Sequence, residues 1–118
     1  MVKQGGGSIV NVVTIPNAAG FALASAHGAA YLGVLSLGQV AAREYAALGV
    51  RVHSIGPESM GTPMAADAAY SGSITSPNPV RCLITPEDVA SLTTFLCSDE
   101  ASTMTGGHYP LDERFNAR

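Results

Sequence analysis

Three side chains early in the chain have types and a spacing that could support proton transfer. Thr14 is followed thirteen residues later by His27, and Tyr31 comes four residues after that. A spacing of four places two side chains on one face of a helix, so the imidazole and the phenol would be neighbours. Imidazole titrates at about 6.5 and could exchange a proton near neutral pH, and the threonine hydroxyl could donate a hydrogen bond.

Each of these residues also has a purely structural interpretation. Thr14 could be a hydroxyl that ends a strand, and His27 a solvent-facing or hydrogen-bonded residue near the start of a helix. Tyr31 could be a packed ring whose hydroxyl finds a partner at an edge. Spacing alone does not fix the geometry that an acid/base pair requires, so both interpretations stay open on the sequence alone.

Two glycine clusters could be mistaken for a phosphate-binding turn. Such a turn must follow a strand and open a helix, so that the first amides of the helix point at the phosphates. Gly5–Gly7 precede the first expected strand, whereas Gly106 and Gly107 lead into the last one. We therefore expect neither cluster to bind phosphate.

Composition excludes several classes of function. The chain of 118 residues carries a formal net charge of -3, with 13% charged residues and no basic run. The sequence therefore predicts no basic surface that would bind a nucleic acid or an anionic membrane. Cys82 and Cys97 stand apart from the histidines and are expected to be free, partly buried thiols, with no metal site. Without an apolar leader or an apolar run of about 20 residues, a cytoplasmic protein without membrane contacts is expected.

The pattern of apolar residues predicts three strands, a long helix and a shorter one in a single domain, 1–118. A buried strand is expected at 8–13, the long helix at 25–48 with Gly49 as its C-terminal cap, and a second strand at 50–55 that Gly56 and Pro57 break. A loop should follow from 58 to 85, with a short helix as one option at 63–69. The motif TPED at 85–88 should start a helix that runs to 97, and the last strand is expected at 108–111. The apolar stripe of that helix should consist of Val89, Leu92, Phe95 and Leu96.

This order of elements predicts an α/β fold with parallel strands, because each strand is followed by a helical crossover. The long helix is apolar on all sides, so one face should lie on the sheet and another should meet a further helix or subunit. The first strand should leave an unpaired apolar edge, which favours association.

Three blocks in the right order resemble the short-chain dehydrogenase/reductases, a family of nicotinamide-dependent oxidoreductases with a Rossmann-type sheet. The first is the Thr14, His27 and Tyr31 spacing; the second is VHSIGPE at 52–58 followed by Thr62 and Pro63; the third is the closing segment from 85 to Asp112. The resemblance implies a partial Rossmann-like, doubly wound parallel sheet, made of the last three of seven strands. It also implies that the half with the glycine-rich cofactor turn is missing.

The resemblance implies a catalytic serine, tyrosine and lysine at Thr14, His27 and Tyr31, so all three residue types are replaced. In the family the lysine lowers the pKa of the tyrosine and holds the nicotinamide ribose. Lys3 is the only lysine of this chain, and no Tyr-xxx-Lys pair occurs in any register. Thr14 could replace the serine, and His27 could transfer a proton, but Tyr31 carries no positive charge.

The resemblance places a cofactor-binding loop after the second strand, where Pro57, Met60 and Thr62 would contact NAD(P). Glu58 stands where the family has a glycine, and a carboxylate there would repel a pyrophosphate. No cofactor is therefore expected for the isolated chain.

Two functional hypotheses follow, together with a third and duller one. The leading hypothesis is a truncated family member without dehydrogenase activity of its own, which acts by association with itself or with a related complete subunit. The alternative is an NAD(P)-dependent oxidoreductase that uses Thr14 and His27 and receives the first half of the fold from another chain. The third is a decayed gene fragment that barely folds.

Overall fold

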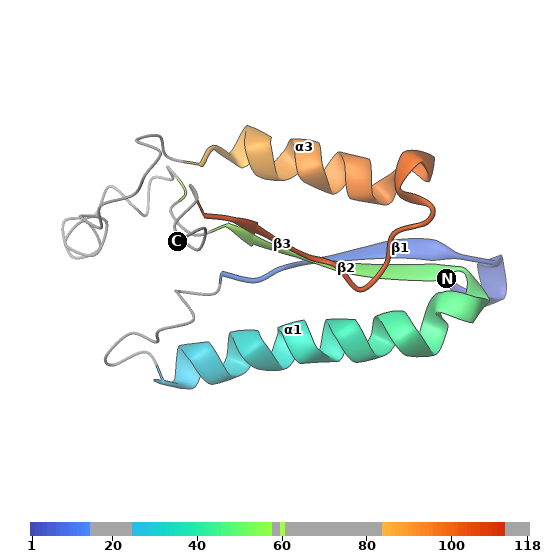
Figure 1. The fold of residues 1–118 in the computed structure, drawn as a ribbon, viewed down its shortest axis with the longest axis horizontal. Helices are drawn as coiled ribbons and strands as arrows, with labels where there is room; N and C mark the ends of the chain where they lie inside the picture. The colour runs from blue at the N-terminus through green and yellow to red at the C-terminus, as the bar shows by residue number, and fades with distance from the viewer. Residues whose placement is uncertain (15–24, 58–59, 61–83, 113–118) are drawn as a thin grey trace.

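The computed structural model of the chain describes residues 1–14, 25–57, 60 and 84–112. Three parallel strands, β1 (Gly7–Val12), β2 (Val50–Pro57) and β3 (His108–Leu111), form one sheet in the order β1-β2-β3. Helix α1 (Ser25–Tyr45) covers one face of the sheet and helix α3 (Pro86–Cys97) covers the other (Figure 1). The expected α/β fold with parallel crossovers is confirmed.

The strands are aligned so that their carboxyl ends meet at one edge of the sheet. β1 pairs with β2 from Gly7↔Val50 to Val12↔Ile55, and β2 pairs with β3 from Ser54↔His108 to Pro57↔Leu111. Both helices begin at this edge (Figure 1). The short 3-10 turns η1 (Val2–Gln4), η2 (Ala46–Leu48) and η4 (Asp99–Ala101) lie at the opposite edge.

The prediction that Gly56 and Pro57 break the second strand is wrong, because β2 runs through Pro57. Gly56 pairs with Pro110 of β3, and the absence of a side chain leaves room for the ring of His108, whose Nε2 lies 2.8 Å from where a Cβ would stand. Pro57 is the last residue of the strand, so the hydrogen bond that its missing amide hydrogen removes is lost only at the end of the ladder. β2 is the central strand, and all of its residues except Arg51 are buried.

Strand β1 is less buried than its apolar sequence predicts. Ile9 is 38% exposed and Val12 is 54% exposed. β1 is an edge strand of the described sheet, paired on one side only with β2, which explains why side chains suited to a buried strand remain open to solvent.

Helix α1 approaches the sheet closely at Gly38. A Cβ at this position would lie 3.0 Å from Nδ2 of Asn11 and 3.3 Å from Oγ of Ser54. One turn later, buried Ala42 packs with Val50 and Val52 of β2 in the hydrophobic core. The helix ends at Tyr45 and continues as η2 to Leu48, and Gly49 then takes the left-handed conformation, φ 74°, that its predicted capping role requires.

The outer face of α1 remains apolar and exposed. Leu37 is 68% exposed, Leu32 54% and Val40 49%, and no charged residue occurs between positions 25 and 42. One of the two faces that the sequence expects to be covered is therefore uncovered in this chain.

Helix α3 begins with the predicted cap. The Thr85 side chain accepts a hydrogen bond from the backbone amide of Asp88, and the Asp88 carboxylate accepts one from the backbone amide of Thr85, so the two residues form a capping box. Of the expected apolar stripe, Leu96 is fully buried, whereas Phe95 is 41% exposed. Cys97 is free and exposed rather than partly buried. The expectations for 63–69 and for Cys82 lie outside the described residues.

Among the described residues, no helix has the length and hydrophobicity needed to cross a membrane. The carboxyl ends of the three strands and the starts of both helices lie at one edge of the sheet (Figure 1). The residues singled out by the sequence can be located relative to this edge.

Candidate functional site

The structure places most of the predicted site residues at the carboxyl edge of the sheet. Thr14 lies two residues after the end of β1 and is half-buried, while His27 and Tyr31 occupy the first two turns of α1, which begins at the same edge (Figure 1). Pro57 ends β2 and is buried. Ligands of open α/β sheets bind outside the carboxyl ends of the strands, so the location is the one expected for a site.

His27 and Tyr31 are in contact. Their ring centroids lie 4.2 Å apart with an interplanar angle of 33°, as the spacing of four residues predicts. His27 is exposed and Tyr31 is half-buried. An imidazole and a phenol stacked in this way form an aromatic pair, and neither ring carries the permanent positive charge of an ammonium group.

Every described cation lies far from this pair. Lys3 belongs to η1, which precedes β1, so the length of a six-residue strand, about 20 Å, separates it from Thr14. Arg43 is twelve residues after Tyr31 on α1, or about 18 Å along the helix axis. Arg51 is at the start of β2 and donates hydrogen bonds to the end of α3. Within the described residues, no ammonium or guanidinium group stands beside His27 and Tyr31.

The loop that the sequence assigns to a cofactor is only partly described. Met60 forms an isolated parallel bridge with Ile84, which places the start of α3 just beyond the end of β2. Thr62 and Glu58 lie outside the described residues, so their predicted roles stay predictions.

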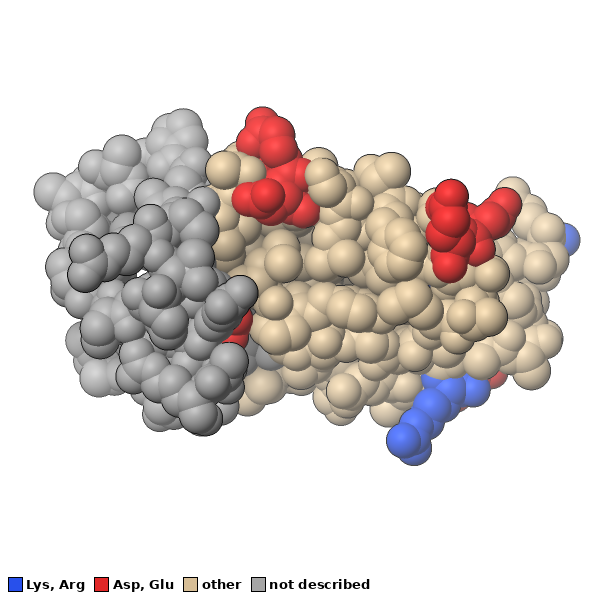
Figure 2. Space-filling model, turned by 45° about the horizontal axis from the view of Figure 1, so that its top comes forward, with Lys and Arg blue, Asp and Glu red and all other residues tan. Residues whose placement is uncertain are grey.

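The start of α3 is poorly suited to hold an anion. Its first turn carries Glu87 and Asp88, and the hydrogen bonds from the Thr85 backbone and side chain lower the pKa of Asp88 below its ordinary value. The carboxylate is therefore ionised at neutral pH and already uses the positive end of the helix dipole. Figure 2 shows carboxylates at both ends of α3 with an uncharged surface between them.

One further ionisable side chain lies near this edge and was not singled out by the sequence. The ring of His108 on β3 lies over Gly56, and the carbonyl oxygen of Val13 lies 3.3 Å from the same empty Cβ position. Burial lowers the pKa of His108, and its Nε2 has no hydrogen-bond partner within the described chain. The available signal was a histidine in a short strand whose other residues carry no charge. Its register partner on β2 is Ser54, and its ring reaches over Gly56, two residues further on.

The described residues do not fit the nicotinamide end of a dinucleotide in the way that the resemblance implies. At the position of the ribose-binding lysine stands Tyr31, a rigid ring that stacks on His27. A rigid phenol cannot take over the long reach or the charge of an ammonium group. No three His, Cys, Asp or Glu side chains lie close enough together to form a metal site in the part of the chain that the structure describes.

Comparison with known proteins gives a consistent result for the whole chain. The family model described as enoyl-(acyl carrier protein) reductase matches residues 1–115. Cyclohexanol dehydrogenase from Acinetobacter sp. strain SE19 is 37% identical over 118 residues, which are 100% of this chain and 47% of that protein. The chain thus spans about half the length of this curated relative.

Solved structures give the same family and the same fold. A short-chain type dehydrogenase/reductase from Mycobacterium ulcerans is 35% identical, with a TM-score of 0.85 over 96% of this chain and 42% of that one. A structure from Beutenbergia cavernae that contains bound NADP at low occupancy is 30% identical, with a TM-score of 0.86 over 100% of this chain and 49% of that one. The chain therefore belongs to the short-chain dehydrogenase/reductase family.

Proposed function

We propose that this protein does not carry out the hydride exchange of its family with its own residues and that it acts by association through helix α1. The observation that carries the first half is the aromatic pair of His27 and Tyr31, 4.2 Å apart, at the positions of the family's tyrosine and lysine. An ordinary phenol titrates at about 10, so a proton donor of that kind needs a neighbouring cation. The described cations are all at the opposite edge of the sheet.

Activity is tested directly on the purified protein. The assay follows absorbance of NADH and NADPH with cyclic alcohols and ketones, the substrate class that the name of the cyclohexanol dehydrogenase relative suggests. We expect no turnover above the rate without protein. Steady turnover would contradict the proposal, and the double variant His27→Tyr/Tyr31→Lys is the matched control, because it restores the family pair.

A second candidate function is an NAD(P)-dependent oxidoreductase, with Thr14 as hydroxyl donor, His27 as acid/base group and the first half of the fold supplied by another chain. It is favoured by one observation: Thr14 and the first turn of α1 belong to the same edge of the sheet. Turnover in the assay that disappears in His27→Phe, which keeps an aromatic ring against Tyr31, would support this candidate instead.

The second half of the proposal rests on the outer face of α1. Five exposed residues share one side of the helix, opposite the side that contacts the sheet: Ala26, Ala30, Gly33, Leu37 and Val40. We call this set the outer stripe. Its first three members are small and its last two are large, so the stripe changes from a flat half to a protruding half along the helix.

This division makes the outer stripe complementary to itself. When two copies of α1 pack antiparallel about a two-fold axis between Gly33 and Leu37, Leu37 faces Gly33 and Val40 faces Ala30 of the other copy. The same arrangement places Glu44, which is exposed, against the first turn of the other α1, which carries no acidic residue. A carboxylate near a helix N-terminus is favourable, so both shape and charge support a second copy as the partner.

Association is measured by size-exclusion chromatography with light scattering across a range of concentrations. We expect a dimer for the unchanged protein and at least about 100-fold weaker dimerisation for Leu37→Glu, because two carboxylates would be buried unpaired against Gly33. Gln39→Glu adds the same charge to an exposed position of α1 on a different side of the helix from Leu37 and should leave the dimer largely intact. A monomer at all concentrations would contradict the association proposal while leaving the activity proposal untouched.

A further inference from the structure

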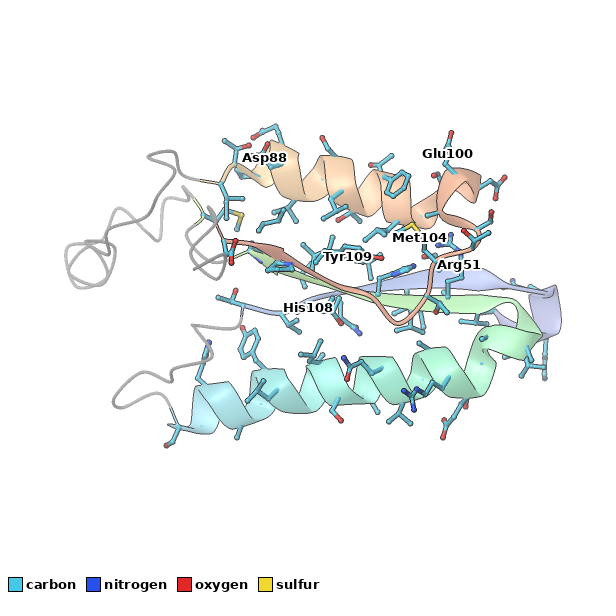
Figure 3. All side chains as sticks on the ribbon, viewed as in Figure 1. Arg51, Asp88, Glu100, Met104, His108 and Tyr109 are labelled. Atoms are coloured by element: carbon cyan, nitrogen blue, oxygen red, sulfur yellow. The ribbon has the colours of Figure 1, made fainter. Side chains whose placement is uncertain are left out.

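A cluster of polar groups between the sheet and α3 holds the C-terminal end of that helix. Arg51 of β2 donates from Nη1 to the carbonyl oxygen of Leu96 at 2.7 Å and from Nη2 to that of Ser98 at 3.0 Å. The Ser8 hydroxyl of β1 also donates to Leu96, at 3.0 Å. The last carbonyls of a helix have no partner within the helix, and a cation suits this end of its dipole. Figure 3 shows Arg51 at this end of α3, on the same side of the sheet as Tyr109.

His53 is the second member of the cluster and is almost completely enclosed, at 1% exposed. Its Nε2 lies 3.3 Å from Nη1 of Arg51, and its ring centroid lies 5.8 Å from that of Tyr109. A guanidinium has only donors, so Nε2 must accept and the single ring proton must be on Nδ1. Nδ1 is buried and makes no hydrogen bond of ordinary geometry to the described residues. This arrangement accommodates the neutral ring and has no acceptor in place for a second proton.

The surrounding groups keep the ring neutral. Burial lowers the pKa of His53, the Arg51 guanidinium lowers it further, and the backbone of Met104 acts weakly in the opposite direction. The packed elements also carry Cys97 on α3, Asp99 and Glu100 on η4, and Tyr109 on β3. Glu87 and Asp88 lie at the other end of α3, His108 lies on the opposite face of the sheet, and β1 contributes the uncharged Ser8. Arg51 is the charged side chain whose field lowers the pKa of His53.

We propose that protonation of His53 releases the C-terminal end of α3 from the sheet. While the ring is neutral, Arg51 is held by Nε2 and binds the carbonyls of Leu96 and Ser98. When Nε2 takes a proton from solvent, its acceptor lone pair becomes an N–H group that faces the N–H groups of Arg51. The two positive charges then repel each other in a buried space. Arg51 leaves the two carbonyls, and the turn formed by η4 detaches from the sheet.

The direction of the pH dependence follows from the geometry and the shifted pKa. We call the state in which Arg51 binds the carbonyls of Leu96 and Ser98 the closed state, and the state in which it has left them the open state. The ordinary histidine pKa is 6.5, and the pKa of His53 in the closed state is lower, so the open state binds more protons. The closed state therefore has its full advantage above about pH 6.5 and loses it as the pH falls below that value. For one proton, the opening equilibrium can shift by up to about tenfold per pH unit.

Amide hydrogen exchange followed by NMR tests this on the complete protein. The amides of Ser98, Ala101 and Ser102 bond to the carbonyls of Phe95, Ser98 and Asp99, so they report on this turn. After correction for intrinsic exchange, their protection should fall about tenfold between pH 7 and pH 5.5, while that of core amides of β2 should not change. Equal loss of protection at all amides would overturn the proposal, because it would mean global unfolding rather than local release.

Two variants assign the effect to His53. His53→Asn keeps an acceptor for Arg51 but cannot be protonated, so the turn should stay protected down to pH 5.5. His108→Val removes the half-buried histidine on the opposite face of the sheet and should leave the pH response unchanged. The NMR titration of His53 in the unchanged protein needs no variant: an unshifted pKa near 6.5, or a pH response retained in His53→Asn, would overturn the proposal.

Discussion

At the scale of single residues, Gly38 illustrates how a missing side chain sets the distance between α1 and the sheet. A Cβ here would lie 3.0 Å from Asn11 and 3.3 Å from Ser54, and the longer branches of a larger side chain would enter β1 and β2. Gly38→Leu should therefore lower the free energy of unfolding by about 1–3 kcal/mol, the usual range for overpacking. Urea unfolding followed by circular dichroism measures this change.

Gly28→Leu is the matched control on the same helix, because a Cβ at Gly28 meets no described atom within 4 Å. It should leave stability unchanged or raise it slightly, since leucine favours helix over glycine. Equal losses in the two variants would show that Gly38 does not act through its close approach to the sheet.

Residues that act through contacts within one helix could be located from the sequence, whereas those that act across elements could not. The contact between His27 and Tyr31 follows from their spacing alone. The hydrogen bond from Arg51 to Leu96 joins a strand and a helix residue 45 positions apart, and the one from Ser8 to Leu96 joins residues 88 positions apart. Such pairs depend on which strand lies beneath which helix, and the sequence of one strand does not contain that information.

At the scale of elements, the motif TPED at 85–88 is the clearest indication in the sequence of where a helix begins, and α3 begins there. Thr85 both accepts from the Asp88 amide, at 3.2 Å, and donates to the Asp88 carboxylate, at 2.7 Å. Thr85→Ala removes both bonds and should cost about 1 kcal/mol of stability, the usual value for an N-cap. Thermal unfolding of the two proteins at pH 7 measures the loss.

Ser91→Ala is the control for this prediction, because Ser91 also bonds locally, to the Glu87 carbonyl, but lies inside α3 rather than at its cap. Alanine has the higher helix propensity, so this variant should be neutral or slightly stabilising. A loss in Ser91→Ala as large as that in Thr85→Ala would show that the cap has no special role.

Element type followed from the sequence, and most element ends did too. The three strands, α1, α3 and the Gly49 cap are where periodicity and capping residues place them. The predicted end of β2 at residue 55 is wrong. A glycine–proline pair usually ends a strand, but here the pairing of Gly56 and Pro57 with β3 extends it. That pairing is a tertiary interaction, and it overrides a local preference.

At the scale of the whole molecule, stability and association through the outer stripe should be linked. If two copies bind through α1, dissociation accompanies unfolding, and the thermal midpoint rises with protein concentration. We expect the midpoint of the unchanged protein to rise by several degrees over a 100-fold increase in concentration. The midpoint of Leu37→Glu should not depend on concentration; if both proteins behave alike, α1 is not the interface.

The register of the sheet has a consequence for how the chain reaches this structure. Gly7 pairs with Val50, 43 positions later, and Ser54 pairs with His108, 54 positions later, so neither strand pair can form as a local hairpin. Each pairing must first close a long loop and lose its entropy before any ladder bond offsets the cost. Contacts of such high sequence separation slow the search for the native state. Newly made chains will therefore spend longer with unpaired strands than a helical protein of this size, and they will depend more on chaperones during synthesis.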